Sequence, residues 1–321
     1  MQPPYELNAE ILMLVSEVSQ KLGAVQAVVL PKQPPSLRRR NRIKTIQASL
    51  AIEGNTLTIE QVTDIVDNKR VLGPAKDIQE VKNALAVYER LSDWKPFSER
   101  SFLSAHRLLM QGLVDQAGSY RTSSVGIIKN GKVAHLAPPA SQVRGLMRDL
   151  FEYARKSKEI PLIRSCVFHY ELEFIHPFTD GNGRMGRLWQ TVLLVQHHPV
   201  FAFLPVESWI GKNQQAYYDA LAQSDKSGSS TPFIAFMLRM MDAALGELLQ
   251  ERVMPLSATD RMDLFLATGA TRFTRKDYMR FHKSLSTATA SRDLREAVAG
   301  HRLQRTGDRN QTVYELTLEA G

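Results

Sequence analysis

The run from His176 to Arg187, HPFTDGNGRMGR, carries an imidazole, a carboxylate, a Gly-Asn-Gly turn and two guanidiniums. An imidazole with an ordinary pKa near ~6.5 is mostly an unprotonated base at neutral pH. Arg184 and Arg187 stand three residues apart, so a helix over this stretch would place both on one face. Asp180 offers an oxygen ligand beside them, which suits Mg²⁺ next to phosphates. The run therefore predicts a phosphate site with a base beside it.

The elements that must position this run are two helices. Apolar residues recur at helical spacing on both sides of it: Ile163, Val167, Tyr170 and Phe174 before, Leu188, Val192 and Val195 after. The run is therefore predicted to be a loop that leads into a helix N-terminus. Gly181 and Gly183 would let the backbone turn tightly and face an anion with its N–H groups. A base that removes a proton from an attacking hydroxyl contributes roughly 10²–10⁴ in rate, and positioning and charge neutralisation supply much of the rest.

The run resembles the signature of the Fic-domain family, HPFxDGNGRxxR, and matches it at every specified position. The resemblance implies a nucleotidyltransferase that moves AMP from ATP to a Ser, Thr or Tyr hydroxyl of a target protein or of itself, releasing pyrophosphate. It implies His176 as the general base, Phe178 as the anchor of the loop and Asp180 as the Mg²⁺ ligand. The anion hole would be formed by Gly181, Asn182 and Gly183. The β- and γ-phosphates would be bound by Arg184 and Arg187.

A second stretch, SLAIEGN from Ser49 to Asn55, ends a predicted helix that carries a basic run. Gly54 and Asn55 are helix-stopping residues, and Glu53 stands at the helix C-terminus, where a carboxylate is slightly unfavourable. The stretch resembles the family's inhibitory motif, (S/T)xxxE(G/N). The resemblance implies that Glu53 pairs with Arg187, occupies the γ-phosphate site and keeps ATP from binding productively. Such a charge-assisted pair contributes on the order of 1.5–3 kcal/mol.

A hairpin is predicted between these two motifs. Val125–Ile128 and Lys132–Leu136 flank Asn130-Gly131, a strong two-residue turn signal. The hairpin resembles the Fic flap, which aligns the target by pairing with its extended backbone. The flap residues would be Val125, Gly126, Ile127, Ile128, Val133, Ala134 and His135. A surface hairpin without this role is the alternative.

Asn213, Tyr217 and Tyr218 fall on or near a helix after the signature. In the family, this region lines the adenine pocket, and contacts from Tyr217 would suit a purine. Core packing of Tyr217 is an equally good interpretation. His106 and His169 lie in helical patterns, and a structural role is expected for both.

The C-terminal stretch predicts a separate small domain. A helix over Asp260–Thr268, a helix capped by Thr274 and a helix opened by Ser286 or Thr287 precede two strands, Leu303–Thr306 and Thr312–Leu318. This order is that of a winged helix-turn-helix and resembles the C-terminal module of many Fic proteins. The residues offered to DNA would be Ser286, Thr287, Thr289, Ser291, Arg292 and Arg295, with Arg309 in the wing. Residues 271–310 hold 10 Lys/Arg and 4 Asp/Glu, a local +6, which agrees with DNA; protein contact or dimerisation is the alternative.

Composition sets the frame for these motifs. The chain has 321 residues, a formal charge of +8 and 43% hydrophobic residues, and its one cysteine, Cys166, is expected to pack in the core. No apolar run is long enough for a membrane span and no signal peptide is recognisable, so a cytoplasmic protein without membrane contact is expected. We predict a mainly α fold: a Fic-type helical core with a β-hairpin flap, plus a small α+β winged helix-turn-helix domain. The expected divisions are an N-terminal helical region, 1–95, with the inhibitory helix at about 36–55, the catalytic core, 96–252, and the winged helix, 256–321.

Other functions stay open at this point. The same site could remove AMP, with Glu53 orienting a water, or transfer another phosphate-containing group, although relatives that phosphorylate depart from the pattern near Gly183. A DNA-binding regulator with a nucleotide-sensing Fic core is a third possibility, and the intact His176 and Asp180 argue against it. A homodimer is expected from the family resemblance alone.

Overall fold

The computed structural model describes residues 3–28, 34–123, 126–129, 132–251, 256–283, 285–308 and 312–317; for 28, 126–129, 132–136 and 251 it describes the backbone. The predicted flap residue Val125, the turn residues Asn130 and Gly131, and Arg309 of the predicted wing lie outside these ranges. The described chain is mostly helical, which confirms the predicted fold class.

The chain forms two compact units. One comprises Met1–Gln26 with Asn41–Leu248, and the other Ala27–Arg40 with Leu249–Gly321. The expected N-terminal helical region and the expected catalytic core therefore lie within one unit, apart from residues 27–40 and 249–252. The residues expected to form the winged helix lie in the other.

The larger unit is built from helices and one hairpin. They are α1 (Ala9–Val28), α2 (Pro35–Ile52), α3 (Ile59–Val66), α4 (Ala75–Glu89), α5 (Glu99–Leu109), β1 (Gly126–Lys129), β2 (Lys132–Leu136), α6 (Ala140–Lys156), α7 (Pro161–Ile175), α8 (Asn182–Val195), a 3-10 helix (Pro199–Ala202), α9 (Val206–Lys212), α10 (Gln214–Ser227) and α11 (Thr231–Glu251). The hairpin is antiparallel, with Gly126 opposite Leu136 and Lys129 opposite Lys132.

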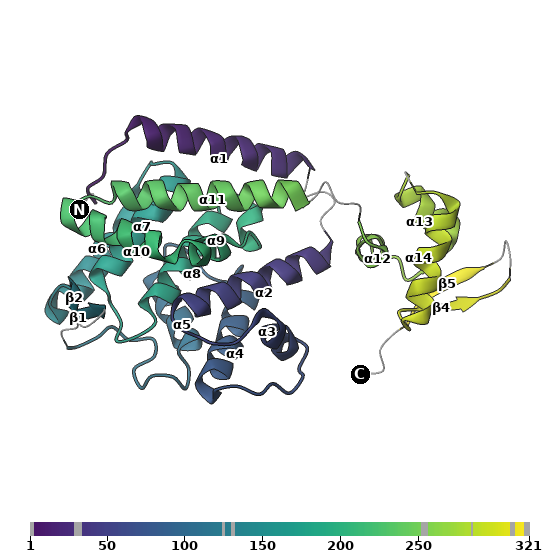
Figure 1. Ribbon diagram of the computed structural model, residues 1–321, viewed down its shortest axis with the longest axis horizontal. Coiled ribbons are helices and arrows are strands. Elements are labelled where there is room, and N and C mark those ends of the chain that lie inside the picture. Colours follow the sequence, from purple (N-terminus) through teal and green to yellow (C-terminus); the bar gives the residue numbers. More distant parts are fainter. Residues whose placement is uncertain are drawn as a thin grey trace. The chain divides into compact units, whose positions relative to one another are not determined.

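Helices α7 and α8 lie inside the larger unit, surrounded by the other helices (Figure 1). Both are buried around most of their circumference, and α8 buries Asn182, Arg184, Arg187 and Gln190 beside its apolar residues. Aromatic rings join them to α5 and α6: the ring centroids of Phe102 and Trp189 are 5.1 Å apart, and those of Phe151 and Phe168 5.3 Å apart. The loop between α7 and α8, residues 176–181, therefore joins two helices that are densely packed in the core.

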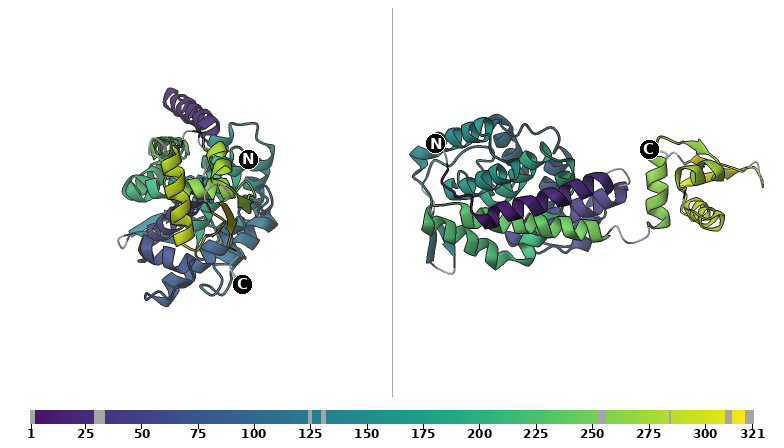
Figure 2. Two further views of the ribbon diagram at one scale, coloured as in Figure 1. Left: turned by 90° about the vertical axis from the view of Figure 1, so that its right-hand side faces the viewer. Right: turned by 90° about the horizontal axis from the view of Figure 1, so that it is seen from above.

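Helix α1 continues past Gly23 to Val28. It lies along α11 (Figures 1 and 2), and Lys21 Nζ contacts Asp242 Oδ2 at 2.7 Å. Val25, beyond the glycine, is fully buried. Burial of that side chain outweighs the cost of a helical glycine, about 1 kcal/mol.

Side chains cap two of these helices. Thr58 and Gln61 form a capping box at α3, and Ser98 caps α5 through Ser101 N. In each case a side-chain oxygen accepts from a first-turn N–H that has no intrahelical partner.

The smaller unit contains three helices and a three-stranded antiparallel sheet. Its elements are α12 (Ala258–Leu266), β3 (Arg272–Phe273), α13 (Arg275–Phe281), α14 (Thr287–Ala299), β4 (Leu303–Thr306) and β5 (Val313–Leu316), with strand order β3-β5-β4. The predicted hairpin is present, whereas the short strand β3 was not predicted. Phe265, Phe273, Tyr278, Leu294 and Leu303 are among the residues that form its apolar core.

A buried ion pair lies in this small core. Arg261 Nε and Nη2 donate to the two oxygens of Asp293 at 2.7 and 2.8 Å, and Tyr278 Oη donates to Asp293 Oδ2 at 3.1 Å. The carboxylate of Asp293 is fully buried. Its partners satisfy both oxygens, so its loss would leave a buried guanidinium unpaired.

None of the helices in the described ranges is both long and apolar enough to cross a membrane.

We predict that Asp293→Ala destabilises the smaller unit by about 3 kcal/mol, because it strands the charge of Arg261. Amide hydrogen exchange along α14 should accelerate while exchange along α8 stays unchanged. The midpoint of urea unfolding followed by tryptophan fluorescence should not change, because Trp94, Trp189 and Trp209 all lie in the larger unit. The control is Asp308→Ala, whose carboxylate is 95% exposed; equal acceleration in both variants would contradict the prediction.

Candidate active site

The candidate base, His176, ends helix α7 in an unusual backbone conformation. Its φ of 50° and ψ of 59° lie in the left-handed region, which costs a non-glycine residue on the order of 1 kcal/mol or more. Neighbours hold it there: its N–H donates to Leu172 O at 2.9 Å, and its carbonyl accepts from Arg121 Nε at 2.7 Å. The turn ends the helix and starts the loop.

The loop closes on itself around Phe178. This side chain is fully buried and stacks on His106, with ring centroids 3.5 Å apart and planes at 4°. The side chain of Asn182 accepts from Phe178 N and donates to Phe178 O, both at 2.9 Å. Phe178 thus lies where an anchor would. The amide of Asn182 is used inside the loop, so this residue can face an anion only with its backbone.

The start of α8 presents free backbone donors. Gly181 caps the helix with φ at 84°, and the N–H groups of the first turn have no intrahelical acceptor. A Cβ on Gly183 would collide with Oε1 of Glu53. The carboxylate of Glu53 therefore lies directly against the backbone of Gly183, at a helix end that favours anions.

Arg187 holds that carboxylate. Its side chain is 1% exposed, and Nη2 donates to Glu53 Oε1 at 2.8 Å. Nε donates to Ser49 Oγ at 3.0 Å and Nη2 to Ser49 O at 2.9 Å. Burial alone would lower the pKa of the Arg187 guanidinium, but Glu53 and other anionic neighbours outweigh it and the pKa is raised. The contact expected between Glu53 and Arg187 is present, and it comes with two further bonds from α2.

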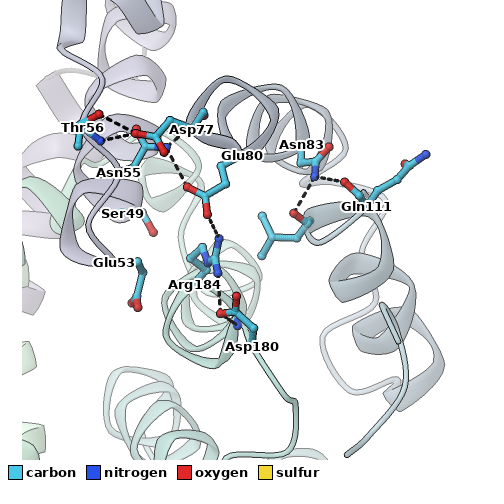
Figure 3. A network of polar contacts seen from close by, with 12 residues as sticks. Ser49, Glu53, Asn55, Thr56, Asp77, Glu80, Asn83, Gln111, Asp180 and Arg184 are labelled. Carbon is cyan, nitrogen blue, oxygen red and sulfur yellow. Dashed lines mark hydrogen bonds and ion pairs between the residues drawn. The ribbon is translucent and has the colours of Figure 1, made fainter. Parts of the chain in front are cut away.

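Arg184 lies between two carboxylates (Figure 3). Nη1 donates to Glu80 Oε1 and Nη2 to Asp180 Oδ1, both at 2.8 Å. The other oxygen of Glu80 accepts from Asn55 Nδ2 at 2.8 Å. A continuous polar chain therefore runs from the turn after α2 through Glu80 to the signature loop. Nothing in the sequence marked Glu80, which reads as an ordinary helical glutamate.

Both arginines keep one buried nitrogen without an acceptor in the described part of the chain: Nε of Arg184 and Nη1 of Arg187. An unpaired buried donor costs about 1–3 kcal/mol, more when it is charged. Phosphate oxygens would satisfy both nitrogens with charge-assisted bonds. The site is thus short of anionic acceptors even with Glu53 in place.

The residues present fit Mg²⁺ shared with a nucleotide. The Asp180 side chain is 47% exposed, and its Oδ1 accepts from Gly181 N at 2.6 Å as well as from Arg184. Its Oδ2 has no hydrogen-bond donor within the described ranges. Those ranges contain no group of three His, Cys, Asp or Glu side chains able to hold a metal ion. One carboxylate oxygen completed by phosphates and water is how Mg²⁺ is commonly held beside nucleotides.

Comparison with known proteins identifies the family. The model of the Fic/DOC family matches residues 96–194. A Fic family protein from Desulfovibrio desulfuricans G20, known from a crystal structure, is 43% identical, with all of both chains covered and a TM-score of 0.77. The chain belongs to the Fic family.

Curated Fic relatives match over a large part of this chain. Protein adenylyltransferase Fic from Nematostella vectensis is 27% identical over 256 residues, covering 75% of this chain and 56% of the relative. Protein adenylyltransferase fic-1 from Caenorhabditis elegans is 27% identical over 267 residues, covering 74% of this chain and 50% of the relative. The chain thus spans about half the length of these relatives.

The residues predicted to bind adenine lie in two environments in this Fic protein. Tyr217 is buried, and its hydroxyl lies 3.2 Å from His169 Nε2, so the core-packing interpretation describes its contacts. Asn213 donates to Trp209 O at 2.9 Å. Tyr218 is only half-buried, and its hydroxyl donates to Ile52 O, the last residue of α2, at 3.3 Å. Of the three, Tyr218 contacts the end of α2, next to Glu53.

His106, for which no catalytic role was expected, braces the signature loop. Its Nδ1 accepts from Gly118 N at 2.8 Å, so the ring proton sits on Nε2, which bonds Asp180 O at 3.0 Å. Burial, with a contribution from Arg184, lowers the pKa of His106 to about 4. The imidazole is therefore neutral at ordinary pH and holds a single tautomer. Its spacing from Asp180 in the chain gave no signal of this contact.

We predict that acid weakens the larger unit through His106. Its pKa is about 4 when folded and near ~6.5 when unfolded. Between these values the unfolded chain binds more protons, so stability is lost as pH falls through this window. The loss from this residue should be about 2 kcal/mol between pH 7 and about pH 4.5. Urea unfolding by tryptophan fluorescence should show a shallower pH dependence in His106→Gln than in wild type, and identical slopes would contradict the assignment.

Proposed function

We propose that this Fic protein transfers AMP from ATP to a hydroxyl side chain of a protein and releases pyrophosphate. One observation carries the proposal: two buried signature arginines each lack one acceptor beside a helix N-terminus, with a base at the far end of the same loop. This arrangement suits a nucleotide phosphate chain better than a single small anion. The names of the curated relatives support the same reaction.

The chemistry follows from the positions of the groups. The imidazole of His176 takes the proton from the acceptor hydroxyl as its oxygen forms a bond to the α-phosphorus. The bond from that phosphorus to the oxygen bridging to the β-phosphate breaks, and pyrophosphate leaves with its electron pair. Arg184 and Arg187 stabilise the charge that develops on the leaving phosphates. Mg²⁺ held by Asp180 would supply further charge neutralisation when bound.

The contact between Glu53 and Arg187 supports a built-in brake. The carboxylate of Glu53 takes a guanidinium nitrogen that ATP would need and stands on the backbone of Gly183. A charge-assisted bond to a buried guanidinium contributes about 1.5–3 kcal/mol, or about 10- to 100-fold in occupancy of the closed state. Ser49 adds two bonds from the same helix.

We predict that Glu53→Gly raises AMP transfer about 10- to 100-fold over wild type, because Arg187 becomes free to bind phosphate. The measurement is label on protein after incubation with α-labelled ATP and Mg²⁺. His176→Ala in the Glu53→Gly background should abolish labelling while ATP binding persists. Ser49→Ala should raise labelling less than Glu53→Gly does. The matched control is Glu60→Ala, an exposed glutamate of α3 that should leave labelling at the wild-type level.

Two results would overturn the assignment. If Glu53→Gly binds ATP but does not label protein, the proposal of AMP transfer is wrong. Loss of label from an AMP-modified protein would then favour AMP removal at the same site. If His176→Ala still labels protein, His176 is not the general base.

We also infer that the smaller unit is a winged helix-turn-helix that binds nucleic acid. A pocket between α13, α14 and the β4–β5 hairpin supports this; its lining is Thr274, Arg275, Lys276, Met279, Thr287, Ser291, Arg295, Arg305, Thr312 and Tyr314. Four of these residues are cationic and none carries a carboxylate. Such a lining suits a phosphodiester backbone, which binds through charge neutralisation.

We predict that the double variant Arg275→Ala/Arg295→Ala binds a random-sequence DNA duplex at least about tenfold more weakly than wild type. The slope of log K against log salt concentration should become shallower by about two. Fluorescence anisotropy at several salt concentrations gives both values. Arg280→Ala, on α13 but outside the pocket lining, serves as the control. Equal binding by all three proteins would point to protein contact instead.

A further inference from the structure

Arg121 is a buried arginine that binds the backbone at the start of the signature loop. The residue is 2% exposed. Its Nε donates to His176 O at 2.7 Å, its Nη2 to Ile175 O at 3.3 Å, and its own backbone N–H to Pro177 O at 2.9 Å. The carbonyls at the end of α7 otherwise lack intrahelical donors, and a cation is favourable at this end of the helix dipole. Arg121 thus fixes the left-handed turn that carries the imidazole.

The same guanidinium binds both ends of the hairpin. Nη1 donates to Ser123 O, before β1, at 2.9 Å, and Nη2 donates to Pro138 O, after β2, at 2.6 Å. Within the described ranges, every acceptor of this side chain is a backbone carbonyl. One planar group therefore joins the entry to the hairpin, the exit from it and the C-terminus of α7.

The chemistry of the group makes this joint rigid. A guanidinium presents its donors in a fixed plane, so its acceptors cannot move independently without losing bonds. A buried cation needs those acceptors, and burial lowers the pKa of Arg121 because the charged form has left water. A lysine would keep the charge but could not reach carbonyls on both sides with one nitrogen.

The hairpin has an open edge for a partner. Strands β1 and β2 form a two-stranded sheet, and neither outer edge pairs with another strand in the described part of the chain. An unpaired edge accepts an extended backbone as an added strand. A peptide bound in this way would be held at a position that depends on where the hairpin stands relative to His176.

We propose that Arg121 is a positioning residue that sets the register between the β1–β2 hairpin and His176, so that a hydroxyl on a backbone paired with the hairpin reaches the imidazole. This proposal rests on the proposed transfer of AMP. Arg121 bonds none of the phosphate-site groups Gly183, Arg184 and Arg187. Its loss should therefore affect delivery of the hydroxyl and leave nucleotide binding in place.

The test uses the full chain in the Glu53→Gly background, with Arg121→Met, Arg121→Lys and the control Arg148→Met. Arg148 is an exposed arginine of α6 that pairs only with its neighbour Asp149 in the described residues. Self-labelling with α-labelled ATP gives kcat and the KM for ATP. Amide hydrogen exchange is followed over 126–129, 132–136 and 175–177.

Arg121→Met should lower kcat about 100-fold, the loss expected from a displacement of about 1 Å, with the KM for ATP unchanged within about threefold. Arg121→Lys should recover part of the rate, and both variants should speed hydrogen exchange in the hairpin. Arg148→Met should match its parent in every measurement. Loss of folded protein would also lower the apparent kcat at constant KM, so kcat is referred to the concentration of ATP-binding sites. A lower kcat per ATP-binding site is the result that a general loss of folding would not produce.

Three outcomes would overturn the proposal. An unchanged kcat in Arg121→Met would remove the positioning role. Parallel loss of ATP binding and kcat in both Arg121 variants would assign the residue to folding alone. Unchanged hydrogen exchange in the hairpin would show that Arg121 does not hold the hairpin to the end of α7. If Glu53→Gly with Arg121 intact transfers no AMP, the proposed function fails, and the exchange measurement still decides whether the joint exists.

Discussion

The buried guanidinium of Arg187 is the constraint on which the rest of the site depends. A charge that is 1% exposed must have acceptors, and α8 itself supplies none to its nitrogens. Helix α2 supplies them through Ser49 and Glu53, and the phosphates of a nucleotide would supply them in its absence. The closed and open states proposed here therefore compete for one electrostatic requirement, so a small change in the hold on α2 shifts the balance between them.

The signature loop and the end of α2, which meet at the contact between Arg187 and Glu53, are held by different interactions. The signature loop stands on buried aromatic rings and is closed by Asn182 across Phe178. The end of α2 combines buried apolar side chains, Leu50 and Ile52, with polar contacts to α10: Ile52 O accepts from Gln214 Nε2 at 2.9 Å and from Tyr218 Oη at 3.3 Å. Polar contacts at a helix end exchange readily with water, whereas aromatic packing does not. Within the proposed brake, the side chain of Glu53 is 33% exposed, so its carboxylate is the group that can exchange an ion pair for water.

Local signals in the sequence predicted most of the elements, because caps, turns and apolar periodicity act over a few residues. The helix opened by Ser286 and the strand Leu303–Thr306 are examples. The sequence did not predict side chains whose partners are distant along the chain: Glu80 reaches Arg184 across 104 positions, His106 reaches Asp180 across 74, and Arg121 reaches His176 across 55. Each has an ordinary local context, and only the tertiary fold gives it a partner. The contact between Glu53 and Arg187 was expected only because the family resemblance carried long-range information.

The close approach of Glu53 to Gly183 restricts how this protein can evolve toward constant activity. A Cβ at position 183 would displace the carboxylate of Glu53, and it would also take up space in the proposed phosphate site. Substitution of the glycine therefore cannot separate release from inactivation. Changes in α2 can, since Ser49 and Glu53 are proposed to serve only the closed state. Gain-of-function variants selected at random should accordingly cluster in α2 and the contacts that hold it, leaving the signature unaltered.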